Sequence, residues 1–188
     1  MVLRKVIVAV LGLLLVLSCF AVDASAYNYP NGTAAKAGDI LVTSDAYSKG
    51  IVGHTGIVTS GSEYLEIRGE GYYPQIRSLS KWFDYKGKPT KVVRISNSSK
   101  ANSAGLYARL YEGSRIPYKI TMNLLDSQYT YCSKLVYQAY AFGTSGVFPI
   151  LEGSRFWGPY NFLQRRAYKD VTPRLVYSKG MWGKGDVN

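Results

Sequence analysis

The chain contains two cysteines, Cys19 and Cys132, and a single histidine, His54. Cys132 stands in "YTYCSKLVYQAY" (residues 129–140), where a polar stretch gives way to an apolar pattern of helical period. A helix N-terminus offers free N–H groups and a partial positive charge, which favour a thiolate and can stabilise an oxyanion. Cys132 is therefore a candidate nucleophile. The competing interpretation is a small, inert, buried residue.

A thiol nucleophile needs an imidazole that takes its proton and later protonates the leaving group. His54, in "GHTGIV", is the candidate, although a lone histidine on a strand is often only a half-exposed polar residue. Side chains alternate along strands, so only positions an even number of residues apart share a face across a three-residue turn at 60–62. We therefore expect Glu66 beside His54, with Glu63 on the other side or in the turn and Glu70 beyond the strand. The alternative for Glu66 is an exposed strand carboxylate.

The elements that would position these residues follow from the hydrophobic pattern. Strands are predicted at 38–44, 53–60, 63–69 and 91–95 and from Arg174, and a short helix at 78–85. A helix capped by Ser98 or Ser99 is expected to end near Gly113, a second to run from Cys132 to just before Gly143, and a short last one to lie within 158–168. The second helix should bury one face, which carries Cys132, Leu135, Val136, Ala139 and Tyr140. Helices and strands interleave without a βαβ rhythm, which predicts an α+β fold.

The N-terminal residues 1–26 read as a signal peptide, with Arg4 and Lys5 before an apolar run and "ASA" at its end. The alternatives are an uncleaved membrane anchor and a lipoprotein cut at Cys19, which Leu17 fits less well. We expect a secreted or cell-envelope protein with a loose lead-in at 27–37 and one domain at 38–188.

Charge and composition narrow the partners and cofactors. Without Arg4, Lys5 and Asp23, the 23 basic and 12 acidic residues of the chain become 21 and 11, a net charge of +10. Such a surface attracts anionic wall polymers, lipid headgroups or nucleic acid, but the charges are scattered, so no specific nucleic-acid site is expected. One histidine and one remaining cysteine are too few for a structural zinc site, and no phosphate-binding or dinucleotide motif is present. We expect a monomer without metal or cofactor.

The motifs "GDIL", "GHTGIV", "YLEI", "IPY" and "YCSKLVYQAY", in this order between about Gly38 and Tyr140, resemble the circularly permuted papain-like enzymes of the NlpC superfamily, specifically the YiiX/YaeF-type group. The resemblance implies an antiparallel sheet packed against a cysteine-bearing helix, with the histidine before the cysteine. It implies Cys132 as nucleophile, His54 as base and Glu66 as third residue. The related lecithin:retinol acyltransferase-like proteins usually carry a second histidine at that third position.

Two further residues match landmarks of that group. Tyr118, after Pro117 in "IPYK", corresponds to a tyrosine whose hydroxyl lies beside the reacting carbonyl, although an ordinary half-buried tyrosine explains it as well. Asp39 in "GDIL" is expected to be structural. The segment 142–160, with Phe148, Phe156 and Trp157, is expected to border the cleft.

The resemblance implies a thiol hydrolase that cleaves an amide or ester through an acyl-enzyme, acting on cell-wall peptides or acyl lipids. Two alternatives stay open. One is a non-catalytic, basic envelope-binding module on the same fold, and the other is an acyltransferase that uses the same thiol.

Overall fold

The computed structural model describes residues 26–45, 53–84, 88–149 and 155–188. Within these residues, six strands form one sheet in the order β4-β3-β2-β1-β5-β6, and every neighbouring pair is antiparallel. The strands are β1 Ile40–Thr43, β2 His54–Val58, β3 Glu63–Glu66, β4 Gln75–Ser78, β5 Thr90–Ile95 and β6 Pro173–Lys179. The predicted mixed α+β class is confirmed.

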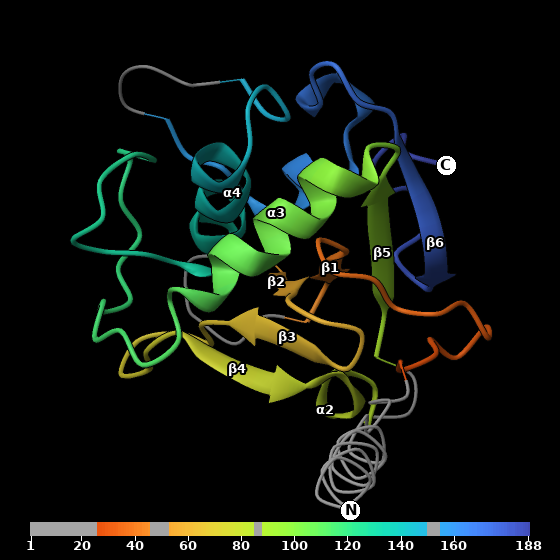
Figure 1. Cartoon of the computed structure of the whole chain (residues 1–188), viewed down its shortest axis with the longest axis horizontal. Helices are drawn as coiled ribbons and strands as arrows, with labels where there is room; N and C mark the ends of the chain where they lie inside the picture. Colours follow the sequence, from red (N-terminus) through yellow and green to blue (C-terminus); the bar gives the residue numbers. More distant parts are fainter. Residues whose placement is uncertain (1–25, 46–52, 85–87, 150–154) are drawn as a thin grey trace, which may run out of the picture.

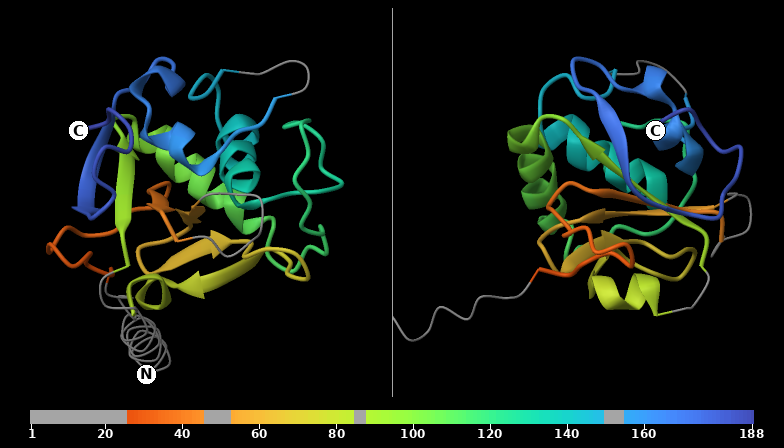
Figure 2. Two further views of the ribbon diagram at one scale, coloured as in Figure 1. Left: turned by 180° about the vertical axis from the view of Figure 1, so that it is seen from behind. Right: turned by 90° about the vertical axis from the view of Figure 1, so that its right-hand side faces the viewer.

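The helices lie on both sides of this sheet (Figures 1 and 2). Their bounds are α2 Leu79–Phe83, α3 Ser98–Arg109 and α4 Cys132–Gly143, with short 3-10 helices η1 Pro159–Leu163 and η2 Arg165–Ala167. Helices α3 and α4 pack against each other and over one face of the sheet, while α2 lies on the opposite face.

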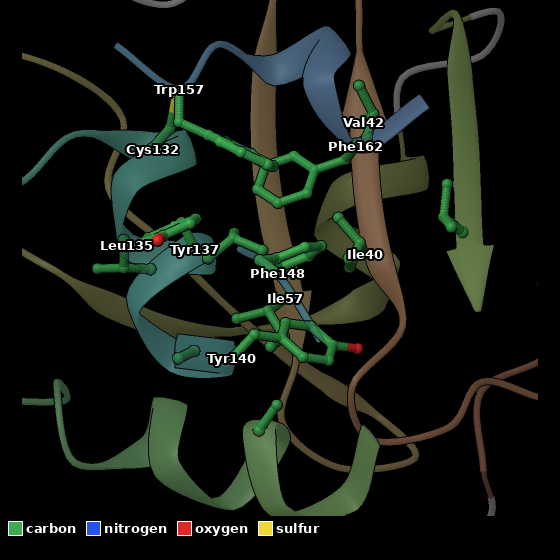
Figure 3. Close-up of a cluster of buried hydrophobic side chains, with 14 of the residues drawn as sticks. Ile40, Val42, Ile57, Cys132, Leu135, Tyr137, Tyr140, Phe148, Trp157 and Phe162 are labelled. Carbon is green, nitrogen blue, oxygen red and sulfur yellow. The ribbon is translucent and has the colours of Figure 1, made fainter. Parts of the chain in front are cut away.

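Because side chains alternate along each strand, the sheet feeds two hydrophobic cores. The larger core lies between the sheet and α3 and α4, where Ile40, Ile57 and Phe148 meet Leu135 and Tyr140 (Figure 3). The smaller core lies on the other face and contains Leu41, Val58, Tyr64, Leu79 and Trp82. The start of β2 therefore lies between helices α3 and α4 on one face of the sheet and an aromatic layer, formed by Tyr64 and Trp82 of the smaller core, on the other.

Helix α4 is buried around its whole circumference from Cys132 to Tyr140, whereas the sequence predicted one buried face. Its polar side chains are satisfied by the segment that precedes it. Lys134 Nζ donates to Thr121 Oγ1 at 3.0 Å, and Gln138 Nε2 donates to the backbone oxygens of Leu124 and Asp126, both at 2.9 Å. A chain segment that covers the polar side of a helix cannot be read from the period of that helix.

The lead-in at 27–37, expected to be loose, is docked on the sheet. Tyr29 is buried, and its hydroxyl donates to Asp39 Oδ2 at 2.6 Å. Arg94 donates to both oxygens of Asp39, each at 2.7 Å, and to the backbone oxygen of Ala34 at 2.8 Å. Asp39 is thus a structural residue, as predicted, and it joins the lead-in to β5.

Other differences from the sequence-based expectations are local. Strand β4 was not predicted, and the N-cap of α3 is Asn97, whose side chain accepts from the Lys100 N–H at 3.0 Å. The predicted signal peptide lies outside the described residues except for Ala26. Across the described parts of the chain, none of the helices is both apolar and long enough to cross a bilayer.

Candidate active site

Cys132 is the first residue of α4. The preceding N-cap, Tyr131, is extended, with φ −144° and ψ 167°, and its side chain makes no capping hydrogen bond in the described structure. The first backbone bond of the helix runs from the Leu135 N–H to the Tyr131 oxygen at 2.9 Å, so the N–H groups before Leu135 precede the helical ladder. The first turn holds no acidic residue. The positive end of the helix dipole therefore acts on the Cys132 thiol without a competing carboxylate of that turn.

His54 begins β2 and is hydrogen-bonded to Glu66, with 2.8 Å between Nε2 and Oε2. The pairing of Ile57 with Leu65 sets the register of β2 and β3 and brings Glu66 opposite Gly56, which is two residues from His54 and on the same face. The structure thus brings His54 and Glu66 together, as the alternation predicts.

The other two carboxylates considered from the sequence lie elsewhere. Glu63 Oε2 accepts from Arg109 Nη1 at 2.8 Å at the surface, and Glu70 is exposed in the loop after β3.

Trp82 of α2 supports the imidazole from the aromatic layer. Its ring stacks on His54 with 5.6 Å between ring centroids and 20° between planes, and its Nε1 donates to Thr90 Oγ1 at 3.2 Å. Gly56 makes room for this contact, because a Cβ there would lie 2.9 Å from Tyr64 Cδ2 and 3.4 Å from Trp82 Cζ3. The sequence analysis treated Trp82 as an inward-facing residue of a short helix and missed this role. The glycine two residues after His54 is the signal that could have suggested it.

Two guanidinium groups lie near the second oxygen of Glu66. Arg68 Nε and Arg77 Nε are each 3.6 Å from Oε1, while Oε2 is bonded to His54. Glu66 is buried, so these positive charges offset the cost of its own charge. Both lie nearer to the carboxylate oxygen that does not bond to His54. Neither arginine was predicted from the sequence.

The thiol and the imidazole shift each other's pKa. Burial raises the pKa of Cys132 and is the largest single effect. The hydrogen bond and positive charge of His54, and hydrogen bonds from the backbone N–H and the hydroxyl of Thr55, outweigh it and lower the pKa below the ordinary value. Burial likewise lowers the pKa of His54, but hydrogen bonds with Cys132 and Glu66, and their negative charges, outweigh it and raise that pKa. Both shifts favour a thiolate beside an imidazolium.

Two buried hydroxyl groups lie on residues next to His54 and Cys132. The Thr55 hydroxyl interacts with the Cys132 thiol and helps to lower its pKa, and Ser133 Oγ, on the residue after the cysteine, has no hydrogen-bond partner among the described residues. Unpaired buried polar atoms are rare in folded proteins and are often explained by a functional site. The sequence analysis did not single out either residue.

Tyr118 lies near the start of α4. It forms an isolated parallel bridge with Thr130, two residues before Cys132, and its half-buried ring packs against the larger core. It also interacts electrostatically with Tyr131, the N-cap of α4. The structure therefore places Tyr118 near the residues that precede Cys132, and its role beside the reacting carbonyl stays a prediction.

The approach to the thiol is narrow, because Cys132 and His54 are each 1% exposed. A cavity of about 360 Å³ lies beyond Tyr131 and is lined by Arg155, Phe156, Trp157, Asn161, Gln164 and Arg166, among others. Phe156 stacks on Tyr131 with 5.4 Å between centroids, and the Trp157 N–H donates to the Tyr131 hydroxyl at 3.3 Å. Of the three aromatic residues predicted to border a cleft, Phe156 and Trp157 line this cavity, whereas Phe148 belongs to the core. The described part of the chain holds no cluster of three His, Cys, Asp or Glu side chains that could bind a metal.

A family model matches most of the chain. A family model described as "Lipoprotein N-acylation protein LnsA-like" matches residues 3–161. A Bacillus thuringiensis protein described as an uncharacterized 30.3 kDa protein is 37% identical over 125 residues, which make up 60% of this chain and 46% of the relative. The chain thus spans about half the length of that relative. The crystal structure of the metalloprotein YiiX from Escherichia coli O157:H7 aligns at 19% identity with a TM-score of 0.42 and covers 57% of this chain and 66% of its own.

Proposed function

The chain belongs to the LnsA-like lipoprotein N-acylation family, and from this membership and the geometry around Cys132 we propose that it is a thiol acyltransferase. The family is of the papain-like NlpC/YiiX type, so the relationship predicted from the sequence is confirmed at that level. The observation that carries the proposal is the arrangement of Cys132 at the start of α4 beside His54, which Glu66 holds at 2.8 Å.

In the proposed mechanism, the Cys132 thiolate attacks the carbonyl carbon of an acyl lipid ester. In this proposal the backbone N–H groups at the start of α4 stabilise the oxyanion together with the Tyr118 hydroxyl, a role that the bridge between Tyr118 and Thr130 supports. The intermediate collapses, the ester C–O bond breaks, and the imidazolium of His54 gives its proton to the leaving alcohol. Cys132 is left as an acyl thioester.

The second half of the reaction transfers the acyl group to an amine. The amine nitrogen attacks the thioester carbonyl while His54 takes the proton, the C–S bond breaks, and the Cys132 thiolate returns as an amide is released. The family description supports an amino group of a lipoprotein as the acceptor. The burial of Cys132 does not distinguish transfer from hydrolysis, because an amine and water must reach the same thioester carbonyl; the family description is what favours the amine. The thiol hydrolase that the sequence analysis placed first is the alternative, and it differs only in the acceptor.

The test supplies phospholipid with a labelled acyl chain and a lipidated peptide with a free amino terminus. We expect a Cys132-dependent mass increase of one acyl group on the protein, and then a labelled N-acyl peptide. If labelled free fatty acid forms at the same rate with and without peptide, the protein is a hydrolase and not an acyltransferase. If the protein never acquires the acyl group and behaves like Cys132→Ala, the non-catalytic envelope-binding module is the remaining explanation.

A further inference from the structure

Four exposed apolar side chains gather beside the start of α4. Ile120, Met122 and Leu125 lie on the segment before the helix, and Phe156 lies on the segment after it, each 37–49% exposed. Single exposed apolar residues are ordinary, but a cluster next to a candidate active site marks an interaction surface. We name these four residues, with the neighbouring cations Lys119 and Arg155, the docking face.

The two segments of the docking face are held together. The Arg155 N–H donates to the Met122 backbone oxygen at 2.7 Å, and Phe156 stacks on Tyr131 next to Cys132. In Figures 1 and 2 the chain between α3 and α4 projects from the side of the molecule. The docking face therefore forms one outward surface at the edge of the candidate active site.

The segment that carries this face is anchored to α4 by polar contacts, while Ile120, Met122 and Leu125 stay exposed. Lys134, whose side chain is fully buried, reaches Thr121 at 3.0 Å and the Asp126 carboxylate at 3.8 Å. Gln138 fixes the backbone at Leu124, whose side chain enters the core, while Leu125 stays outside. Two buried polar side chains of α4 thus hold the backbone rigid with its apolar side chains exposed. Because this segment is already ordered, it loses little conformational entropy when it binds a partner.

The charged side chains around the docking face indicate which class of partner it binds. Lys119 and Arg155 are exposed at its border, and the Asp126 carboxylate on the same segment faces Lys134 instead. Apolar side chains bordered by lysine and arginine match a bilayer, in which anionic headgroups lie above acyl chains. The net charge of the chain, +11, has the same sign.

We propose that the docking face binds an anionic membrane surface. The four apolar side chains enter the boundary between headgroups and acyl chains, and Lys119 and Arg155 contact lipid phosphates. The choice of a membrane rests on the proposed function, because an acyl lipid as donor must be reached at a bilayer. Docking in this orientation brings Tyr131 and the cavity at Phe156 to the lipid surface, beside Cys132.

The test measures co-sedimentation with vesicles of phosphatidylcholine, with and without phosphatidylglycerol. It uses the chain from Ala26 onward with Cys132→Ala, which contains every described element and cannot turn over lipid. One variant combines Ile120→Ser, Met122→Ser and Phe156→Ser. Its matched control combines Leu106→Ser, Leu110→Ser and Phe142→Ser, which removes three apolar groups that are 42–71% exposed from α3, its C-cap and the far end of α4. A third variant combines Lys119→Glu and Arg155→Glu.

We expect the parent and the matched control to bind the anionic vesicles alike. The triple docking-face variant should bind at least about 10-fold more weakly, and the charge variant should lose its preference for phosphatidylglycerol. Equal binding by parent and docking-face variant, equal loss in the matched control, no preference for anionic lipid, or no binding at all would each overturn the inference.

These outcomes separate the inference from the proposed function. If the protein does not bind vesicles but acylates Cys132 from dispersed lipid, the acyltransferase proposal holds and the docking-face proposal fails. If the protein binds vesicles through the docking face but never acylates Cys132, the docking-face proposal holds and the acyltransferase proposal fails.

Discussion

At the scale of single residues, the account depends on how the imidazole is held between two different neighbours. Glu66 takes Nε2 at 2.8 Å, which leaves Nδ1 as the ring nitrogen for the thiol proton, and Trp82 covers the flat face of the ring. Fixing the tautomer and orientation of a histidine is how such a third residue contributes to catalysis. Glu66 is thus a positioning residue, because it acts through His54 rather than on the substrate.

Removal of Glu66 should therefore weaken catalysis without removing the nucleophile. We expect Glu66→Ala to lower the rate of Cys132 acylation by about 10²-fold, in line with the loss of well-oriented proton transfer. Glu66→Gln should recover part of the rate, since its amide oxygen can still accept from Nε2. Acylation kinetics with a labelled lipid ester measure both. Glu63→Ala is the control, because Glu63 is half exposed and pairs with Arg109 on the surface. Equal rates for Glu66→Ala and Glu63→Ala would rule out this role.

Sequence reasoning could name the candidate nucleophile, base and third residue because their types are scarce or their spacing is periodic. One histidine and one cysteine outside the leader leave few alternatives, and strand alternation is a local property. Trp82 and Arg77 could not be found in this way, because their residue types are common and only the packing of α2 and β4 against β2 and β3 brings them to the site. Thr55 and Arg68 lie next to His54 and two residues after Glu66, but their residue types are too common to single them out.

At the scale of the elements, helices and central strands were predictable where a pattern was strong. Helix α4 and the β2–β3 hairpin follow from helical period, alternation and a Ser-Gly-Ser turn. Strand β4 was missed because it is an edge strand in which no residue is fully buried, so its sequence shows no apolar alternation. The burial of α4 on all sides was missed because the segment at 119–126 covers its polar side through Lys134 and Gln138. Which strand lies at the edge of a sheet, and which segment covers a helix, depends on tertiary structure and cannot be read from local sequence patterns.

At the scale of the whole molecule, one buried carboxylate joins three distant parts of the chain. Asp39 precedes β1, accepts from Tyr29 of the lead-in and is bonded twice by Arg94 of β5. The lead-in covers the smaller core through Tyr29 and Ala35, so this junction supports the face that holds Trp82 against His54.

Breaking this junction should destabilise the fold. Asp39→Asn removes one partner of a buried ion pair and leaves the Arg94 charge uncompensated, which typically costs about 3–5 kcal/mol. Asp84→Asn breaks an exposed pair with Lys81 of 3.2 Å and should change the free energy of unfolding by less than about 1 kcal/mol. Urea unfolding of both variants gives the comparison. Similar midpoints would contradict the structural role of Asp39.

The central claim is that His54 activates Cys132, and the pH dependence of Cys132 alkylation by iodoacetamide tests it most directly. The structure places the pKa of the thiol below its ordinary value, which is about 8.5, and that of His54 above its own. Both shifts favour the thiolate–imidazolium pair. The wild-type alkylation rate should rise at a pH below the ordinary thiol pKa, and in His54→Ala this rise should move to higher pH, while Tyr118→Phe leaves it in place. A wild-type rate that rises only at or above the ordinary thiol pKa, and that His54→Ala does not shift, would contradict the account.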